Sequence, residues 1–388
     1  MNPRKTSLVA TLAVLLAAGC NETFRTIVIP QVSGGGDPEA SKIAVVVADG
    51  GASVDGTATT FNLSGDTNIG QVTVGRVPKF AVPFTGTLRT AVANSADPSL
   101  TLYTTRIPSG VQPTTITLPM GSAPSALFYS SGANMYAAFA GRDSIGVIEL
   151  TTSIFRTEIP LGAGANPVYL LGVTFTSKVY VANQGNGTVS VIDTAVNAKF
   201  SDIVVGSQPS WMALSADQAR LYVVNRGSGT VSVIDTSTDA VTATINVGAG
   251  PTFAVFDPKL LRVYVANTGG GSVSVINADP LSPNYYAATT VTVGARPTQV
   301  AALPDGSRAY VANSGSGTVS VINTTGNNVV KTITVGTVPI AIAASPDSLK
   351  VIVGNNGSNN VSFIRTSDDT VTATLPVTGK PVYIYSSQ

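Results

Sequence analysis

The sixteen residues LYVVNRGSGTVSVIDT (221–236) decide the fold of this 388-residue chain, because close copies of them recur along it. The copies are VYVANQGNGTVSVIDT (179–194), VYVANTGGGSVSVINA (263–278), AYVANSGSGTVSVINT (309–324) and the more divergent VIVGNNGSNNVSFIRT (351–366). Successive copies start 42, 42, 46 and 42 residues apart. A period of this length indicates one supersecondary unit that is used many times.

Each copy predicts two strands and a tight turn. In residues 179–182 and 189–192 apolar side chains occupy nearly every position, which is typical of strands covered on both faces. Asn183, Gly185 and Gly187 lie between the two strands, and Asn and Gly tolerate the positive φ that tight hairpins need. We therefore expect the recurring Asn to be a turn residue first of all.

The rest of each repeat supplies two more strands. Residues 241–247 alternate apolar residues with Thr or Asn, as a half-exposed strand does. A Gly-Ala-Gly-Pro break follows at 248–251, then an apolar run at 252–256 and a second turn at Asp257. Four strands every forty-odd residues indicate a blade of a β-propeller, so we expect an all-β propeller of four-stranded antiparallel blades.

A proline before each predicted innermost strand allows the blades to be counted. These are Pro78, Pro124, Pro167, Pro209, Pro251, Pro297, Pro339 and Pro381. They bound seven complete repeats, with one strand left over at 382–385 and about three strands before Pro78, at 43–47, 57–63 and 71–74. We expect these to combine into an eighth blade, so that the C-terminal strand closes the first blade. Seven blades with the N-terminal strands packed outside is the alternative.

The N-terminus predicts export and lipid attachment. Arg4 and Lys5 precede an apolar run that is too short to span a bilayer, and small residues lead to Cys20, the single cysteine. We interpret residues 1–19 as a signal peptide, 20–41 as a tether with a Gly-rich linker, and 42–388 as the propeller. LLAAGC resembles the bacterial lipobox, which implies lipidation of Cys20, and Asn21 implies by the same resemblance an outer-membrane protein facing the periplasm or cell surface.

The charge of the chain gives little support for nucleic-acid binding. Charged residues make up 11% of the sequence, and without Arg4 and Lys5 there remain 20 basic side chains against 21 acidic ones. No basic run that could follow a phosphate backbone is present. We expect a monomer, with self-assembly through the edges of Thr-rich outer strands as the alternative.

The repeats resemble a known family. YVAN at 180–183, 264–267 and 310–313, and YVVN at 222–225, each followed by a Gly-rich turn and a V-S-V-I run, are similar to the YVTN-type β-propeller repeat. The resemblance implies the scaffold and frequent export. Related propellers include lactonases, a streptogramin lyase and a haem d1 domain, but the scaffold does not fix the activity.

The sequence contains no histidine, which excludes the catalytic mechanisms and metal sites that depend on this residue. No Ser-His-Asp or Cys-His nucleophile and no His-ligated haem or zinc site can be built from this chain. Carboxylates remain: Asp193 and Asp235 end the third strand of their repeats, and Asp217, Asp257, Asp305 and Asp347 lie between the first and second strands. We expect them to cap turns. We therefore expect no metal and no cofactor, with a loop-held Ca²⁺ as the alternative.

A ligand site is expected at one mouth of the propeller, where the Gly-x-x-Pro loops and the Asn-x-Gly hairpins should share a face. Aromatic and polar residues around the prolines are the candidates for a sugar, peptide or small apolar ligand. They are Arg76, Phe80, Asn166, Tyr169, Gln208, Trp211, Phe253, Arg296, Gln299, Lys380 and Tyr383. The alternative for the aromatics is that they simply pack between blades.

Two functions follow from the sequence. The first is a membrane-anchored, non-catalytic binding or scaffold propeller for a protein, peptide or glycan. The second is a lactonase-like hydrolase or lyase that uses channel carboxylates and a metal. The sequence names neither a substrate nor a ligand, and it leaves open whether the protein is an enzyme.

Overall fold

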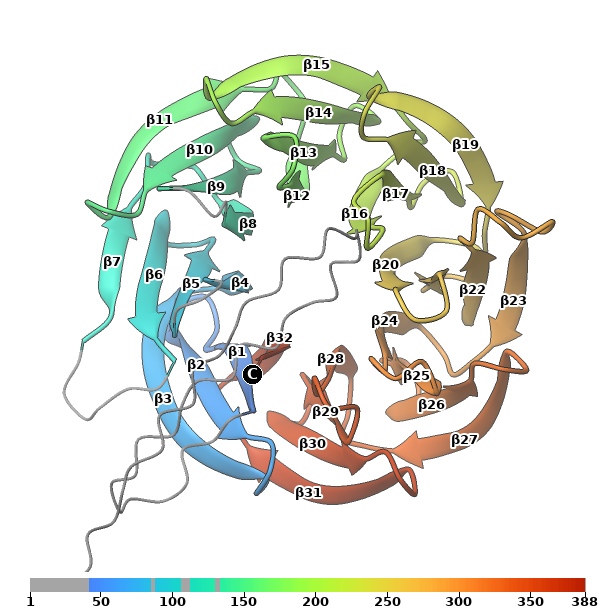
Figure 1. The fold of residues 1–388 in the computed structure, drawn as a ribbon. Coiled ribbons are helices and arrows are strands. Elements are labelled where there is room, and N and C mark those ends of the chain that lie inside the picture. Colours follow the sequence, from blue (N-terminus) through green and yellow to red (C-terminus); the bar gives the residue numbers. More distant parts are fainter. Residues whose placement is uncertain (1–41, 85–87, 106–111, 130–132, 388) are drawn as a thin grey trace, which may run out of the picture. The chain divides into compact units, whose positions relative to one another are not determined.

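The structure is a computed structural model that describes residues 42–84, 88–105, 112–129 and 133–387. All regular structure within these ranges is β, and it forms eight four-stranded antiparallel sheets. The sheets stand as blades around a common axis (Figure 1). The predicted eight-bladed propeller is confirmed, and the seven-bladed alternative is wrong.

The strands of each blade follow one another along the chain, except in the first blade. That blade contains β1 (Ile43–Asp49), β2 (Asp55–Asn62), β3 (Thr67–Arg76) and β32 (Lys380–Ser387). The second contains β4 (Pro78–Pro83), β5 (Arg89–Asn94), β6 (Ser99–Thr104) and β7 (Thr114–Thr117). The third contains β8 (Pro124–Tyr129), β9 (Asn134–Phe139), β10 (Ser144–Glu149) and β11 (Ile154–Pro160). The fourth contains β12 (Pro167–Val173), β13 (Lys178–Asn183), β14 (Thr188–Asp193) and β15 (Ala198–Val204).

The remaining four blades repeat this order. The fifth contains β16 (Pro209–Leu214), β17 (Arg220–Asn225), β18 (Thr230–Asp235) and β19 (Ala240–Asn246). The sixth contains β20 (Pro251–Asp257), β21 (Arg262–Asn267), β22 (Ser272–Asn277) and β23 (Ala288–Thr292). The seventh contains β24 (Pro297–Ala302), β25 (Arg308–Asn313), β26 (Thr318–Asn323) and β27 (Asn328–Thr334). The eighth contains β28 (Pro339–Ala344), β29 (Lys350–Asn355), β30 (Asn360–Arg365) and β31 (Thr370–Pro376).

The two ends of the propeller meet in the first blade, as the proline count predicts. Strand β32 pairs antiparallel with β1, so that Val46 lies opposite Ile384 and Val45 opposite Tyr385. In Figure 1 the red C-terminal strand lies beside the blue β1. The pairing joins strands more than 300 residues apart and thereby closes the ring.

The second and third strands of each blade form the core between neighbouring blades. In β17, Leu221, Tyr222, Val223 and Val224 are fully buried, and β18 has the same character. Such strands are apolar on both faces because each face is covered by an adjacent blade. The outermost strands keep a solvent face, which explains their threonines.

The recurring Asn has a different role from the expected one. Asn183 is fully buried at the end of β13, and its carboxamide donates to the hydroxyls of Thr188 (3.0 Å) and Ser190 (2.8 Å) on β14. The positive φ of the hairpin falls on Gly187 (71°) instead. The same arrangement recurs in the next blade, where Asn225 donates to Thr230 and Ser232 of its own blade. The Asn therefore joins two strands by its side chain.

Polar contacts also bind each blade to the next. The Tyr180 hydroxyl on β13 donates to Asp239 (2.6 Å) in the turn between β18 and β19, and Lys178 forms an ion pair with the same carboxylate (2.7 Å). Tyr136 bonds Asn197 in the same way, one blade earlier (2.6 Å). These partners are about sixty residues apart in the sequence and belong to neighbouring blades. The contacts therefore connect neighbouring blades at the edge of the apolar core.

Some sequence predictions concern parts of the chain that the structure does not describe. The signal peptide, Cys20 and the tether lie in residues 1–41, outside the described residues. The longer connection between β22 and β23 carries Tyr285 and Tyr286, whose rings stack with centroids 3.7 Å apart. Within the described ranges, no helix has the length and apolar character needed to cross a membrane.

Candidate functional site

One face of the propeller is built from two kinds of loop that hydrogen-bond to each other; we call it the mouth face. The loop that leads into each innermost strand offers carbonyls, and the hairpin after the recurring Asn offers amides. Gln208 accepts from the amide of Arg226 (3.0 Å), and Arg296 accepts from that of Ser314 (3.0 Å). The two loops therefore share a face, as expected from the sequence, and together they fix where each innermost strand begins.

The residue before each proline takes a left-handed conformation in seven blades. Its φ lies between 44° and 56° at Val77, Ala123, Asn166, Gln208, Gly250, Arg296 and Val338. Such a φ is uncommon for residues other than glycine and is costly for β-branched valine. The paired loops impose it, and it turns the chain sharply into the innermost strand. In the first blade Gly379 (96°) takes this conformation, one residue before Lys380.

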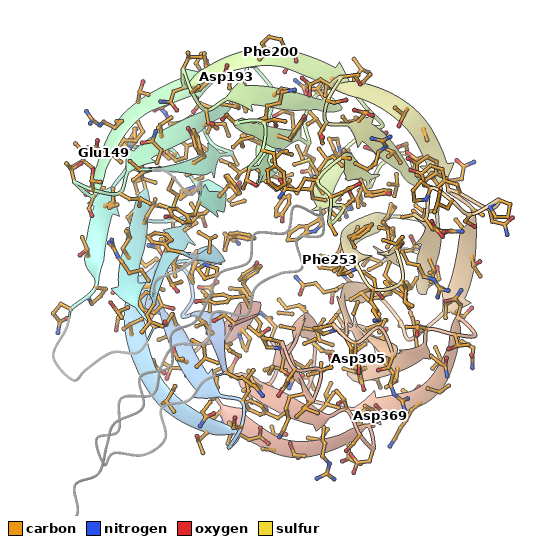
Figure 2. The ribbon with its side chains drawn as sticks, in the orientation of Figure 1. Glu149, Asp193, Phe200, Phe253, Asp305 and Asp369 are labelled. Atoms are coloured by element: carbon orange, nitrogen blue, oxygen red, sulfur yellow. The ribbon has the colours of Figure 1, made fainter. Side chains whose placement is uncertain are left out.

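A β-bulge follows the proline and aims the third residue of the strand. The register shifts between Pro209 and Trp211, and likewise between Pro167 and Tyr169. A bulge re-aims a side chain relative to the regular pleat. Figure 2 shows the corresponding residue of the sixth blade, Phe253, on the inner side of the ring.

The re-aimed side chains form a continuous series of aromatic contacts. Tyr383 lies against Phe80 (ring centroids 4.5 Å apart), and Phe80 meets Tyr169 edge-on (5.9 Å). Tyr169 stacks on Trp211 at 3.8 Å, and Trp211 contacts Phe253 at 4.8 Å. Phe80 and Tyr169 belong to the second and fourth blades and meet because the third blade has only Ala126 at this position.

A cavity of about 490 Å³ opens against this aromatic series. It is lined by Lys79, Phe80, Ser95, Ala123, Pro124, Ser125, Ala140, Val168, Tyr169, Trp211, Gln299, Val382 and Tyr383. This volume suits a small molecule or one side chain of a larger partner, and apolar walls with few polar groups are typical of ligand sites.

The polar groups of the cavity are mostly free hydrogen-bond donors. Burial raises the pKa of the Tyr169 and Tyr383 phenols well above the usual value, so both keep their protons. No other described residue bonds either hydroxyl. The Gln299 side-chain oxygen accepts from the amide of Ile342 (3.1 Å), which leaves its NH₂ group to donate. Lys79 adds an exposed ammonium group.

The comparisons with known proteins fit this architecture. Residues 196–282 match the family described as "Lactonase, 7-bladed beta-propeller". Dihydro-heme d1 dehydrogenase NirN is a structural neighbour with a TM-score of 0.73 and 14% identity, over 92% of this chain and 77% of that one. The family match covers part of the fourth blade, the fifth blade and most of the sixth, so it shows a likeness of these blades alone.

Two further solved structures show the same fold. A putative 6-phosphogluconolactonase from Bacteroides fragilis aligns with a TM-score of 0.61 and 14% identity, over 92% of this chain and all of that one. Apo AztD from Citrobacter koseri aligns with a TM-score of 0.66 and 12% identity, over 89% and 98% of the two chains. No curated protein sequence matches this chain. At these identities the likeness shows the fold alone.

The sequence-predicted site residues divide into three groups. Five of them line the cavity: Phe80, Tyr169, Trp211, Gln299 and Tyr383. Phe253 lies beside Trp211, and Asn166, Gln208, Arg296 and Lys380 lie on the mouth face just before the prolines. Arg76 is bound to Asp97, with its Nε 2.7 Å from the carboxylate, so it is a structural ion pair.

Sequence reasoning missed Lys79, Ser95 and Ser125 as lining residues. Ser95 belongs to the hairpin after Asn94, and Lys79 directly precedes the aromatic position of its strand. Lys79 and Ser125 carried a signal, because each directly follows one of the counted prolines, Pro78 and Pro124.

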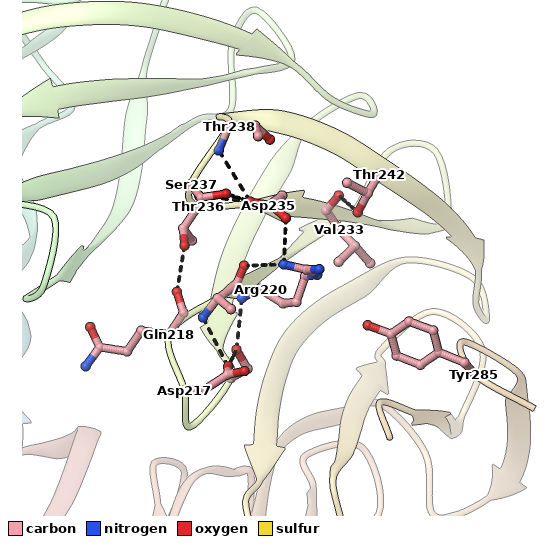
Figure 3. Close-up of polar contacts among 12 residues, drawn as sticks. Asp217, Gln218, Arg220, Val233, Asp235, Thr236, Ser237, Thr238, Thr242 and Tyr285 are labelled. Carbon is pink, nitrogen blue, oxygen red and sulfur yellow. Dashed lines mark hydrogen bonds and ion pairs between the residues drawn. The ribbon is translucent and has the colours of Figure 1, made fainter. Parts of the chain in front are cut away.

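The carboxylates considered as catalytic candidates cap turns at the opposite end of the blades. Asp217 accepts from the amide of Ala219 (3.1 Å) and Asp235 from that of Ser237 (2.9 Å), while Arg220 donates to Asp235 (2.7 Å) (Figure 3). Ser237 and Arg220 lower the pKa of Asp235. The capping role expected for these residues is confirmed.

Carboxylates near the mouth face are also engaged. Asp143 accepts from the amides of Gly164 (2.8 Å) and Asn166 (2.7 Å), and Asp97 is paired with Arg76. In the described residues, no three His, Cys, Asp or Glu side chains gather as metal ligands would. None of the described residues that line the cavity carries a carboxylate.

Proposed function

We propose that this lactonase-like propeller is a non-catalytic binding protein that holds part of a protein, peptide, glycan or small-molecule ligand in the cavity at its mouth face. The observation that carries the proposal is the stack of Tyr169 on Trp211 beside a cavity with unused donors. A stacked aromatic pair offers a flat apolar surface, and free donors at its edge provide orientation.

A lactonase-like hydrolase is less well supported by the side chains. Metal-assisted hydrolysis needs oxygen or nitrogen ligands that converge on an ion and leave an open position. Most carboxylates described at the two ends of the blades already cap turns or form ion pairs, and no described carboxylate lines the cavity. The cavity can hold and orient a ligand, but its lining offers no general base.

The location of the protein is part of the proposal. Lipid attachment at Cys20 would tether the propeller to a bacterial membrane outside the cytoplasm, with the outer membrane as the expected site. Only the sequence supports this step. Mass spectrometry of the mature protein from its host checks it: the expected N-terminal peptide begins at a diacylated Cys20. An N-terminal peptide that begins elsewhere or carries an unmodified Cys20 contradicts it.

The single tryptophan of the chain lies in the cavity and reports on binding. The experiment titrates the protein with N-phenyl-1-naphthylamine, an uncharged apolar fluorophore, and excites Trp211. We expect saturable energy transfer at one probe per chain, with an affinity at least about fivefold weaker in Tyr169→Ala, because truncation of an aromatic anchor in a binding site costs about 1 kcal/mol or more.

Phe200→Ala is the matched control, since Phe200 is an aromatic on the outer strand β15 that is 71% exposed and lies outside the ring (Figure 2). This variant should bind the probe as the parent protein does. Absence of energy transfer from Trp211, or equal weakening in both variants, would overturn the proposal.

A further inference from the structure

Four cations on the mouth face have no side-chain partner among the described residues. Most other described cations are bound by the protein: Lys178 pairs with Asp239 (2.7 Å), Arg220 with Asp235 (2.7 Å) and Lys350 with Asp66 (2.5 Å). The exception is Lys259, which follows the far end of β20. The four are Lys79, Arg226, Arg296 and Lys380, and no described residue gives their side chains a hydrogen bond or an ion pair. All four are exposed.

The topology places these four charges around the cavity. Lys79 lines it directly. Lys380 begins the strand that carries Tyr383, and Arg296 lies three residues before Gln299. Arg226 lies in the hairpin whose amide bonds Gln208, just before the strand that carries Trp211. They come from the second, fifth, seventh and first blades, so they surround the aromatic series and do not form one basic run.

A general excess of positive charge does not explain them. The chain carries 22 basic and 21 acidic residues, which leaves it almost neutral. A near-neutral protein that gathers four of its five described unpaired cations around one apolar cavity creates a local positive potential there. Of the carboxylates on the same face, Asp97 is held by Arg76, Asp143 by backbone amides and Asp49, opposite Lys380 in the β1–β32 pairing, by the amide of Gly51, whereas no described hydrogen bond or ion pair holds the exposed Asp55.

The donors inside the cavity favour the same kind of ligand. The Tyr169 and Tyr383 hydroxyls and the Gln299 NH₂ group can all donate to an oxyanion, and the two phenols stay protonated because they are buried. The walls between them are aromatic and apolar. A ligand that matches both features has a planar apolar body and an acidic group at its edge.

We infer that the cavity selects a small aromatic acid, with its ring on Tyr169 and Trp211 and its carboxylate or sulfonate toward Lys79 and the cations of the rim. The inference rests on the proposed function and adds the ligand class to it. Selectivity arises because the acidic group gains from four unpaired cations, whereas a neutral isostere of the same shape gains only from the aromatic walls.

The test compares two fluorophores of nearly the same shape: 1-anilinonaphthalene-8-sulfonate, which carries the acid, and N-phenyl-1-naphthylamine, which lacks it. Both are followed by energy transfer from Trp211, which restricts the signal to the cavity. We expect the sulfonate to bind more tightly, and we expect this preference to shrink as salt is raised, because exposed charges are screened.

The decisive variant is Lys79→Gln/Arg296→Gln/Lys380→Gln. Each exposed charge pair contributes up to about fivefold in binding affinity. The ratio of the sulfonate affinity to the neutral-probe affinity should therefore fall by roughly fivefold or more in the triple variant. Lys259→Gln is the matched control, since Lys259 is an exposed lysine without a described partner that follows the far end of β20, and the ratio should not change.

The possible outcomes separate this inference from the proposed function. Binding of the neutral probe with no preference for the sulfonate overturns the inference and leaves the binding site standing. A preference that survives unchanged in the triple variant also overturns the inference. If neither probe receives energy from Trp211, the proposed function itself fails.

Discussion

Phe139 and Gly146 occupy together the space that Asn and Ser fill in six other blades. Phe139 ends β9 where the other blades have the recurring Asn, and Gly146 lies on β10 where they have Ser or Thr. A Cβ built on Gly146 would approach the Phe139 ring to 2.1 Å. The third blade has thus exchanged a polar contact between two strands for an apolar one, and the two positions changed as a pair.

This pair makes a prediction about coupling. Gly146→Ser should destabilise the propeller by about 1–3 kcal/mol, because overpacking forces the ring to move. Phe139→Asn alone leaves a void and an unpaired amide and should cost about 3 kcal/mol or more. The double variant Phe139→Asn/Gly146→Ser rebuilds the usual contact, so its cost should be smaller than the sum by at least about 1 kcal/mol. Urea unfolding of the four proteins measures the coupling.

Gly70→Ala is the control for these variants. Gly70 lies in the exposed strand β3, and a Cβ there meets no atom within 4 Å. This substitution should change stability by less than about 0.5 kcal/mol. Additive costs for Phe139 and Gly146 would contradict the account.

A second prediction concerns the contacts between blades. Tyr180→Phe removes the hydroxyl that donates to Asp239 at 2.6 Å and should cost about 1.5–3 kcal/mol, as is usual for a hydrogen bond to a charged group. Tyr264 occupies the same position two blades later, but its hydroxyl is buried and no described residue bonds it. Arg262, close by, donates to Asn327 instead (3.0 Å). Tyr264→Phe should therefore be neutral or slightly stabilising.

The same denaturation assay separates these two variants. They delete the same atom from the same position of different blades, so equal losses of stability would show that the hydroxyl contact between blades is not what matters.

A third prediction concerns alkaline pH. Burial raises the pKa of Tyr264 from its ordinary value of 10.0 to about 12, and raises the pKa of Tyr180 still further, with help from the Asp239 carboxylate. Folding therefore favours the protonated phenols. Their contribution is fully present below pH 10, where the unfolded phenol is also protonated, and is lost as pH rises from about 10 toward the raised values.

The free energy of unfolding should consequently be flat with respect to these groups up to about pH 9.5 and fall steeply above pH 10. Tyr264→Phe should make the fall of the unfolding free energy between pH 10 and 12 less steep, by at most the slope that the titration of one proton produces. Unfolding curves at a series of pH values measure this. An unchanged slope in the variant would contradict the assignment.

A fourth prediction concerns ring closure. Removal of β32 (residues 380–388) exposes the buried face of β1 and opens the first blade, since Val45 and Val46 pair with Tyr385 and Ile384. We expect a loss of several kcal/mol and a melting temperature lower by 10 °C or more, because whole-strand burial of apolar side chains is worth about 1.5–3 kcal/mol per residue. Calorimetry measures the change.

Deletion of Gln388 alone is the control for this truncation, because it leaves every pairing of β32 in place. Equal melting temperatures for the two truncated proteins would show that closure by β32 does not hold the ring.

The sequence by itself determined the parts of this protein that depend on local pattern. The forty-odd-residue period and the eight prolines are properties of neighbouring residues, and they give the blades, their number and the pairing of residues 380–387 with 43–49. The capping carboxylates were also predictable, since Asp235 and the amide of Ser237 are two residues apart.

Only the tertiary structure decided which side chains meet across blades. The contact of Phe80 with Tyr169 needs Ala126 between them, and the bond of Tyr180 to Asp239 joins residues 59 apart, so no spacing within one repeat reveals either. The buried role of the recurring Asn was missed for a related reason. Asn suits both a turn and a contact between strands, and only the packing of Thr188 and Ser190 against it shows which one applies.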